Sequence, residues 1–286
     1  MMEALAVAVA LASALCFAGS FVAEQHAASR VSEERGKGLR LFRELARSPI
    51  WWAGACGDLF GFALQALALA FGSVVLVQPV LVTSMVFALP LAARWNGRRI
   101  QRADVGWSLV VVAALAVFTI VGDTSKGRVD DSPQPWLWPA VAFGAVCVCL
   151  LVTSWLTRGA GKALALGTLA GVTYGVIAPV TELVVVHLGP LGALGLLRSW
   201  PVYALAALML LGTAWQQAAF HAGDLGASLP ATQVLEPVVA VGLGFWVLDA
   251  RLQTHGWGWV ALAAAGAAMV IGTARLARGA ARPSEA

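Results

Sequence analysis

Long runs of hydrophobic residues alternate with short polar segments along the whole of this chain. A helix needs about 20 apolar residues to cross a bilayer core of about 30 Å. The strands of a membrane β-barrel would alternate apolar and polar positions, whereas runs such as 109–117 are apolar throughout. The pattern therefore predicts an all-α, polytopic membrane helical bundle.

The runs predict nine spans, arranged as two inverted repeats of four and five helices. A short acidic segment at 123–135 contains prolines and favours a seam between a first repeat at 1–130 and a second at 131–286. The expected spans cover residues 4–23, 50–71, 73–93, 105–122, 136–156, 163–186, 201–219, 228–248 and 257–274.

Composition supports a membrane location. Hydrophobic residues make up 59% of the chain and charged residues 12%, against about 25% charged residues in a typical soluble domain. The net charge of +4 follows from basic residues beside the spans, so it does not indicate a nucleic-acid partner.

Basic residues predict the orientation, because lysine and arginine concentrate in cytoplasmic loops. Of the 19 lysines and arginines, four lie on the predicted outer side, and the other fifteen lie in segments that nine spans place on one side. We therefore expect a multi-pass protein of the plasma membrane, with the amino terminus outside and the carboxyl terminus in the cytoplasm. The cytoplasmic segments are 24–49, 94–104, 157–162 and a short basic tail.

The longest cytoplasmic loop, residues 24–49, has two interpretations. Its leucines and Phe42 stand among arginines, which favours a short interfacial helix on anionic headgroups. Gly36 and Gly38 weaken a helix, so a solvated linker stays open.

Two stretches of the chain repeat one pattern. Gln78-Pro79 and Glu236-Pro237 each lie in an apolar run that is followed by a short break and a helix rich in Gly, Ala and Val. With nine spans the two helices run in opposite directions. Inverted repeats of this kind occur in many secondary transporters, whose substrate sites lie near the bilayer midplane.

These motifs resemble the two halves of the EamA-like drug/metabolite transporter superfamily. The segment Pro49-Ile50-Trp51-Trp52-Ala53-Gly54 is similar to the P-x-W-W-x-G motif of the NIPA-like branch, which is linked to magnesium transport. The resemblance implies inverted repeats and a transport function. The superfamily has five helices in each half, whereas this chain has four in its first half and a polar loop at 24–49 where a helix could have been.

Three acids are expected inside spans, namely Asp58, Glu182 and Glu236, and no span contains a lysine or arginine. Buried charges usually mark a function. Without a basic partner, these acids would be protonated, hydrated or paired with a cation. Asp58 and Glu236 lie about 13 Å from the cytoplasmic end of their helices and could face one cavity, where they would be the ligands if magnesium is carried. Glu182 lies nearer the outer end, where a snorkelling role is the alternative.

Amides and prolines extend the candidate path. Glutamines inside spans can line a polar route or join helices by hydrogen bonds. A proline inside a helix leaves a carbonyl without its donor, which favours a kink or a cation ligand. The candidates for the path are Gln65, Gln78, Gln217 and Gln233, and the candidate kinks are Pro79, Pro179 and Pro237.

These features favour a secondary transporter of a small metabolite or cation that works by alternating access and is coupled to a proton or cation. A NIPA-type magnesium transporter and a non-transporting membrane scaffold are the alternatives. The sequence shows no metal-ligand pair, nucleophile with a base, or phosphate loop, so we expect neither an enzyme nor a bound cofactor. The expected partners are the bilayer and the substrate, and a homodimer stays open.

Overall fold

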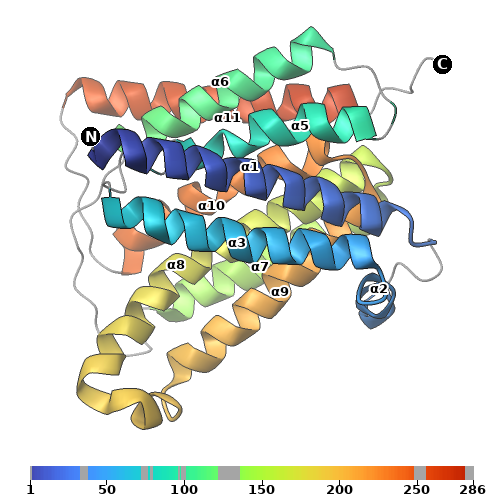
Figure 1. Cartoon of the computed structure of the whole chain (residues 1–286). Helices are drawn as coiled ribbons and strands as arrows, with labels where there is room; N and C mark the ends of the chain where they lie inside the picture. Colours follow the sequence, from blue (N-terminus) through green and yellow to red (C-terminus); the bar gives the residue numbers. More distant parts are fainter. Residues whose placement is uncertain are drawn as a thin grey trace.

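The computed structural model describes residues 2–32, 38–71, 77, 80–95, 97, 101–121, 136–247 and 256–280. All regular structure within these ranges is helical (Figure 1), which confirms the all-α prediction. The helices in chain order are α1 (Met2–Ser29), α2 (Leu39–Leu45), α3 (Pro49–Phe71), α5 (Ser84–Trp95), α6 (Arg102–Val121), α7 (Leu137–Leu156), α8 (Ala160–Leu196), α9 (Trp200–Ala222), α10 (Leu225–Val247) and α11 (Trp257–Ala280).

Five segments within the described residues are long and apolar enough to cross a bilayer. They lie in α1, α7, α8, α9 and α11. The prediction of a membrane-embedded helical bundle is therefore confirmed at this level. The count of nine spans and their grouping into two repeats stay predictions. The seam at 123–135 lies outside the described residues.

The ends of several helices differ from the prediction. Helix α1 continues to Ser29, where the sequence predicted an end at residue 23 and a loop from residue 24. The last turns of α1 contain polar residues that are buried inside the bundle. A hydropathy pattern interprets such a polar segment as a loop. Helix α11 continues to Ala280, so Arg275 and Arg278 belong to a helix and not to a tail.

The segment after α1 contains the short helix α2, as one of the two interpretations of the 24–49 loop proposed. Leu41 and Leu45 of α2 are buried in the main hydrophobic core, whereas Leu39 is exposed. The apolar residues of this segment therefore anchor it to the bundle, and the interpretation as a plain solvated linker is wrong for residues 39–45.

Helix α8 is longer than the predicted span 163–186. It runs to Leu196 and contains one residue with a non-helical backbone, Gly192, at φ 65°. This left-handed conformation favours glycine, so the chain turns there before α9 begins. Pro179 lies within the helical part of α8.

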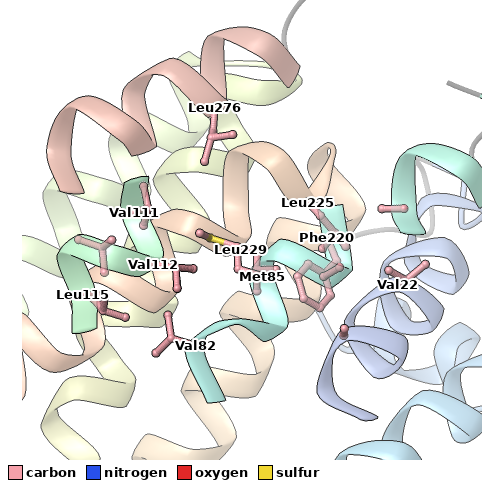
Figure 2. Packing of buried hydrophobic residues seen from close by; sticks show 14 of the residues in the cluster. Val22, Val82, Met85, Val111, Val112, Leu115, Phe220, Leu225, Leu229 and Leu276 are labelled. Carbon is pink, nitrogen blue, oxygen red and sulfur yellow. The ribbon is translucent and has the colours of Figure 1, made fainter. Parts of the chain in front are cut away.

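The main hydrophobic core joins helices from both ends of the sequence. Figure 2 shows buried side chains of α1, α5, α6, α9, α10 and α11 that point toward one another. Helices α6 and α11 pack against each other along this core, and so do α1 and α5. The labelled residues are Val22, Val82, Met85, Val111, Val112, Leu115, Phe220, Leu225, Leu229 and Leu276.

Helix α7 has a different environment. It packs mainly against α8, and most of its apolar side chains are exposed, including Trp155 and Leu156. A helix whose exposed surface is this apolar is suited to contact with lipid.

Helices α8 and α10 approach each other along a stripe of glycines. Gly167, Gly171 and Gly175 face the α10 backbone at Ser228, Thr232 and Glu236. The hydroxyl of Thr232 donates a hydrogen bond of 2.9 Å to the carbonyl of Gly167. Small residues four apart allow such close contact between membrane helices.

Substitution of Gly171 by alanine should destabilise this contact. An added Cβ would lie 2.6 Å from the carbonyl oxygen of Thr232, and overpacking of this kind costs about 1–3 kcal/mol. A lower melting temperature in detergent, followed by tryptophan fluorescence, is the expected result. Gly144→Ala on α7 is the matched control, because a Cβ there meets nothing within 4 Å. Equal melting temperatures of the two variants would contradict this packing.

Candidate functional site

Two carboxyl groups meet in the bundle where α1 packs on α3. Glu24, near the end of α1, is 5% exposed, and its carboxyl group interacts with that of Asp58 on α3. An ionised carboxylate can only accept hydrogen bonds. A hydrogen bond between the two carboxyl groups would therefore need a proton on one of them.

Helix α9 supplies a third member of this site. The amide Nε2 of Gln217 donates a hydrogen bond of 2.8 Å to Oε2 of Glu24, and Gln217 is itself 2% exposed. The hydroxyl of Ser20, one turn before Glu24, interacts with Asp58 and donates to the carbonyl of Cys16. Residues far apart in the sequence thus converge on one buried polar cluster, Ser20, Glu24, Asp58 and Gln217, which we call the acid cluster.

Glycines on α3 leave space for the side chains of Ser20 and Glu24, the α1 members of the acid cluster. A Cβ at Gly54 would lie 2.7 Å from Cγ of Glu24, and one at Gly57 would collide with the hydroxyl of Ser20. A third glycine, Gly61, contacts the ring of Phe17. Gly54, the glycine of the P-x-W-W-x-G-like segment, therefore has a steric role, because it leaves room for the Glu24 side chain.

The acid cluster contains buried oxygens whose hydrogen-bonding capacity is not used. Asp58 Oδ1 and Gln217 Oε1 are buried and have no hydrogen-bond partner among the described residues. No lysine or arginine of the described part of the chain interacts with either acid. A buried acceptor without a partner is costly, so the cluster is suited to bind a proton, a water molecule or a cation.

Tyr174 on α8 connects the acid cluster with the third acid of the bundle. It interacts electrostatically with Glu24, Asp58 and Glu236, and it forms a hydrogen bond with Thr213. Its ring lies against Gly212 of α9. Glu236 on α10 is accessible by its surface area, unlike Glu24, although protein atoms surround its carboxyl group on most sides.

The structure brings together only some of the predicted site residues. Asp58 and Gln217 meet through Glu24, whereas no interaction between Asp58 and Glu236 occurs among the described contacts. Gln65 on α3 and Gln233 on α10 are half-buried, and Pro237 lies inside α10. Three predictions lie outside the described residues: Gln78, Pro79 and the side chain of Glu182.

The sequence analysis missed two members of the acid cluster, namely Ser20 and the acid Glu24. Glu24 stands in the polar run Glu24-Gln25-His26, directly after the apolar residues of the first run. Hydropathy assigns such a run to a loop, yet in the structure Glu24 and Gln25 are both buried. The likeness of Val22-Ala23-Glu24 to Val180-Thr181-Glu182 is a signal that could have indicated Glu24.

The apolar helices and the buried acid cluster define the class of the protein as a helical membrane protein with several spanning helices. Over 284 aligned residues the chain is 34% identical to an uncharacterized protein from Corynebacterium glutamicum, and the alignment covers 98% of this chain and 97% of that protein. The chain therefore belongs to the same family as the corynebacterial protein. No protein-family model and no solved structure matches the chain.

Proposed function

We propose that this protein is a secondary transporter, which moves a small metabolite or a cation across the plasma membrane by alternating access. The observation that carries the proposal is the acid cluster. Glu24 is buried and Asp58 half-buried, no lysine or arginine of the described residues interacts with them, and Gln217 of the second half donates a hydrogen bond to Glu24. A group that takes up and releases a proton or cation while two halves of a transporter move is expected at such a boundary.

The helix contacts support two related halves. In the first half α1 packs on α3 and α5, and α5 packs on α6. In the second half α8 packs on α9 and α10, and α10 packs on α11. The order of contacts is the same in both sets of four, which leaves α7 without a counterpart. In this correspondence the 24–49 segment does not take the place of a counterpart of α7.

The last helix of each half adds a sequence match. Both α6 and α11 have a Gly-Trp pair near their first residue, and in both stretches another glycine follows 16 residues after the first. With nine spans these two helices cross the membrane in opposite directions, as inverted repeats require. The residues are Gly106-Trp107 with Gly122 and Gly256-Trp257 with Gly272.

The acids determine which coupling is physically reasonable. With no basic partner, an ionised pair in apolar surroundings is costly. A proton or a cation that comes from the aqueous phase removes this cost and leaves again when the site opens to water. We therefore propose coupling to a proton or cation through the acid cluster, with the amino terminus outside and the carboxyl terminus in the cytoplasm.

Magnesium transport is the second candidate. Carboxylate and amide oxygens are the ligands that this hard cation takes, and Asp58 Oδ1 and Gln217 Oε1 have no other partner among the described residues. The ligands would be Glu24 with Asp58, in place of the expected Asp58 with Glu236. Growth of a strain that cannot import magnesium, with and without this protein, would test the idea.

Reconstitution in lipid vesicles tests the main proposal. The purified protein would be screened with metabolites and cations, with and without an imposed proton gradient, and a dye inside the vesicles would report pH. We expect that the protein accelerates uptake of at least one compound and that the gradient changes its rate. A folded protein that moves no compound and no protons would favour a membrane scaffold and contradict the proposal.

A further inference from the structure

The short helix α2 lies across one end of the bundle. In Figure 1 it is seen nearly along its axis, whereas α1 and α3 run in the plane of the picture. Its residues Leu41 and Leu45 are buried in the main hydrophobic core, to which Ala28 of α1 and Phe220 of α9 also belong. The inner side of α2 therefore forms part of the region where the last turns of α1 and α9 meet.

The outer side of α2 combines basic and apolar residues. With about 3.6 residues per turn, Arg43 points away from the buried leucines, and Leu39 and Arg40 lie on either side of it. Leu39 is 88% exposed, and both arginines are exposed as well. We call Leu39, Arg40 and Arg43 the outer face of α2. A leucine exposed among arginines suits the boundary between acyl chains and headgroups.

The segment around α2 is basic overall. Residues 30–47 contain six lysines and arginines and three acids. One of these acids, Glu44, forms an ion pair of 3.5 Å with Arg47, just after α2. The net positive charge of the segment therefore attracts an anionic surface.

The whole end of the bundle at which α2 lies shares this charge. Gly223, directly after α9, lies against Ala163 near the start of α8, and Ala163 packs with Ala277 in the last turns of α11. Exposed bases described at this end are Arg30, Arg40, Arg43, Arg47, Arg94, Arg102, Arg158, Arg275 and Arg278. The acids described there, Glu44, Asp104 and Asp224, are half-buried. At the other end, the exposed base within the described ranges is Arg198.

Neighbouring residues place α2 at the level of the lipid headgroups. Helix α1 contains a segment able to cross the bilayer, which ends at Ser29. Gly54 of α3 lies against Glu24 of α1, so the first turns of α3 are level with that end. Trp52 is 51% exposed there, and its indole Nε1 donates a hydrogen bond of 2.9 Å to the carbonyl of Ala46, the residue after α2. Exposed tryptophans of membrane proteins concentrate at the membrane–water interface.

Lipid is the partner that fits this position. Leu59 lies two turns beyond Trp52 on the same side of α3 and is also exposed. This side of α3 is therefore apolar and open, as a surface in contact with acyl chains is. Lipid phosphates lie at the boundary of those chains, and a planar guanidinium group binds phosphate oxygens through two parallel hydrogen bonds.

We propose that the outer face of α2 binds the headgroups of anionic phospholipids in the leaflet that surrounds this end of the bundle. Arg40 and Arg43 bind the phosphates, and Leu39 enters the boundary of the acyl chains. A bound lipid holds α2 and, through Leu41 and Leu45, the end of the bundle where α1 meets α9. The inference goes beyond the transport function, because a membrane scaffold would bind lipid in the same way.

Quenching by brominated lipids measures binding at this site. In the full chain with its native cysteines replaced by alanine, Ala46→Cys would carry a fluorophore. The protein would be reconstituted in phosphatidylcholine vesicles that contain a small share of brominated phosphatidylglycerol or brominated phosphatidylcholine. Each arginine near an anionic surface strengthens binding by roughly fivefold. We therefore expect phosphatidylglycerol to be preferred by roughly tenfold or more, and the preference to decrease at high salt, which screens exposed charges.

Two double variants locate the site. Arg40→Gln with Arg43→Gln should lower the preference for phosphatidylglycerol by at least about fivefold. The matched control, Arg158→Gln with Arg278→Gln, removes the same charge from exposed positions at the same end and should keep the preference.

Three results would overturn the proposal. Equal quenching by the two brominated lipids, with all arginines present, would show that α2 does not select anionic lipid. An equal loss of preference in both double variants would assign the selection to the charge of the whole end and not to α2. A fluorophore that neither lipid quenches would place the outer face in water, where it would meet a soluble partner.

Discussion

Glu24→Gln should abolish coupled transport. The substitution keeps the size of the side chain and its ability to form hydrogen bonds, but it removes the group that exchanges a proton or binds a cation. A positioned group that transfers a proton contributes about 10²–10⁴-fold to a rate, so the coupled rate should be at least about 100-fold lower. The measurement is the initial rate of proton or substrate flux in vesicles that contain equal amounts of folded protein.

Glu44→Gln is the control for this experiment. Glu44 is an acid on α2, outside the acid cluster, and forms an ion pair of 3.5 Å with Arg47. Its substitution should leave the rate unchanged. A Glu24→Gln variant that transports at the wild-type rate, with the same dependence on pH, would show that Glu24 has no part in coupling.

Double substitution of the acid pair should separate stability from transport. Glu24→Leu leaves Asp58 buried without its partner, and Asp58→Leu leaves Glu24 in the same situation, so each single variant should lose about 1–3 kcal/mol of stability. The double variant leaves neither carboxyl group. Its loss should be smaller than the sum of the single losses by at least about 1 kcal/mol, although it cannot transport.

A second double-mutant cycle, with a residue that lies away from the acid pair, provides the comparison for the stability losses. Glu24→Leu combined with Leu183→Ala should be additive to within about 0.5 kcal/mol, because Leu183 is buried in a separate hydrophobic cluster. Thermal unfolding in detergent, followed by tryptophan fluorescence, gives all the values. Additive losses for Glu24 and Asp58 would contradict the pairing of their carboxyl groups.

The positions of most helices could be predicted from hydropathy, whereas the ends of α1 and α8 could not. The apolar runs identified α3, α6, α7 and α9 to within a few residues of their ends. Where a helix ends in polar residues that are buried by a neighbour, as α1 does at Glu24 and Gln25, the one-dimensional pattern places the end too early. The partners that bury these residues, Gln217 and Gly223, are almost 200 positions away.

The candidate site was predictable only in part, for a related reason. The sequence identified Asp58 as an acid inside an apolar run, and depth along the helices suggested Glu236 as its partner. Depth, however, does not determine which faces of two helices meet. The contact between α1 and α3 depends on Gly54 and Gly57, which admit Glu24 and Ser20, and these steric details decide that Asp58 meets Glu24.

If the two proposed repeats are correct, α7 has no counterpart, and this has a consequence for the origin of the fold. A unit of four membrane-crossing helices starts and finishes on the same side of the bilayer, so a tandem copy would enter the membrane in the original direction. Under the nine-span topology, the single additional crossing of α7 turns the second copy over. Its peripheral packing on α8 agrees with such a history, since a connector can be added at the rim of a bundle without a new core. One helix with few interior contacts would thus have converted a gene duplication with parallel copies into one with opposed copies.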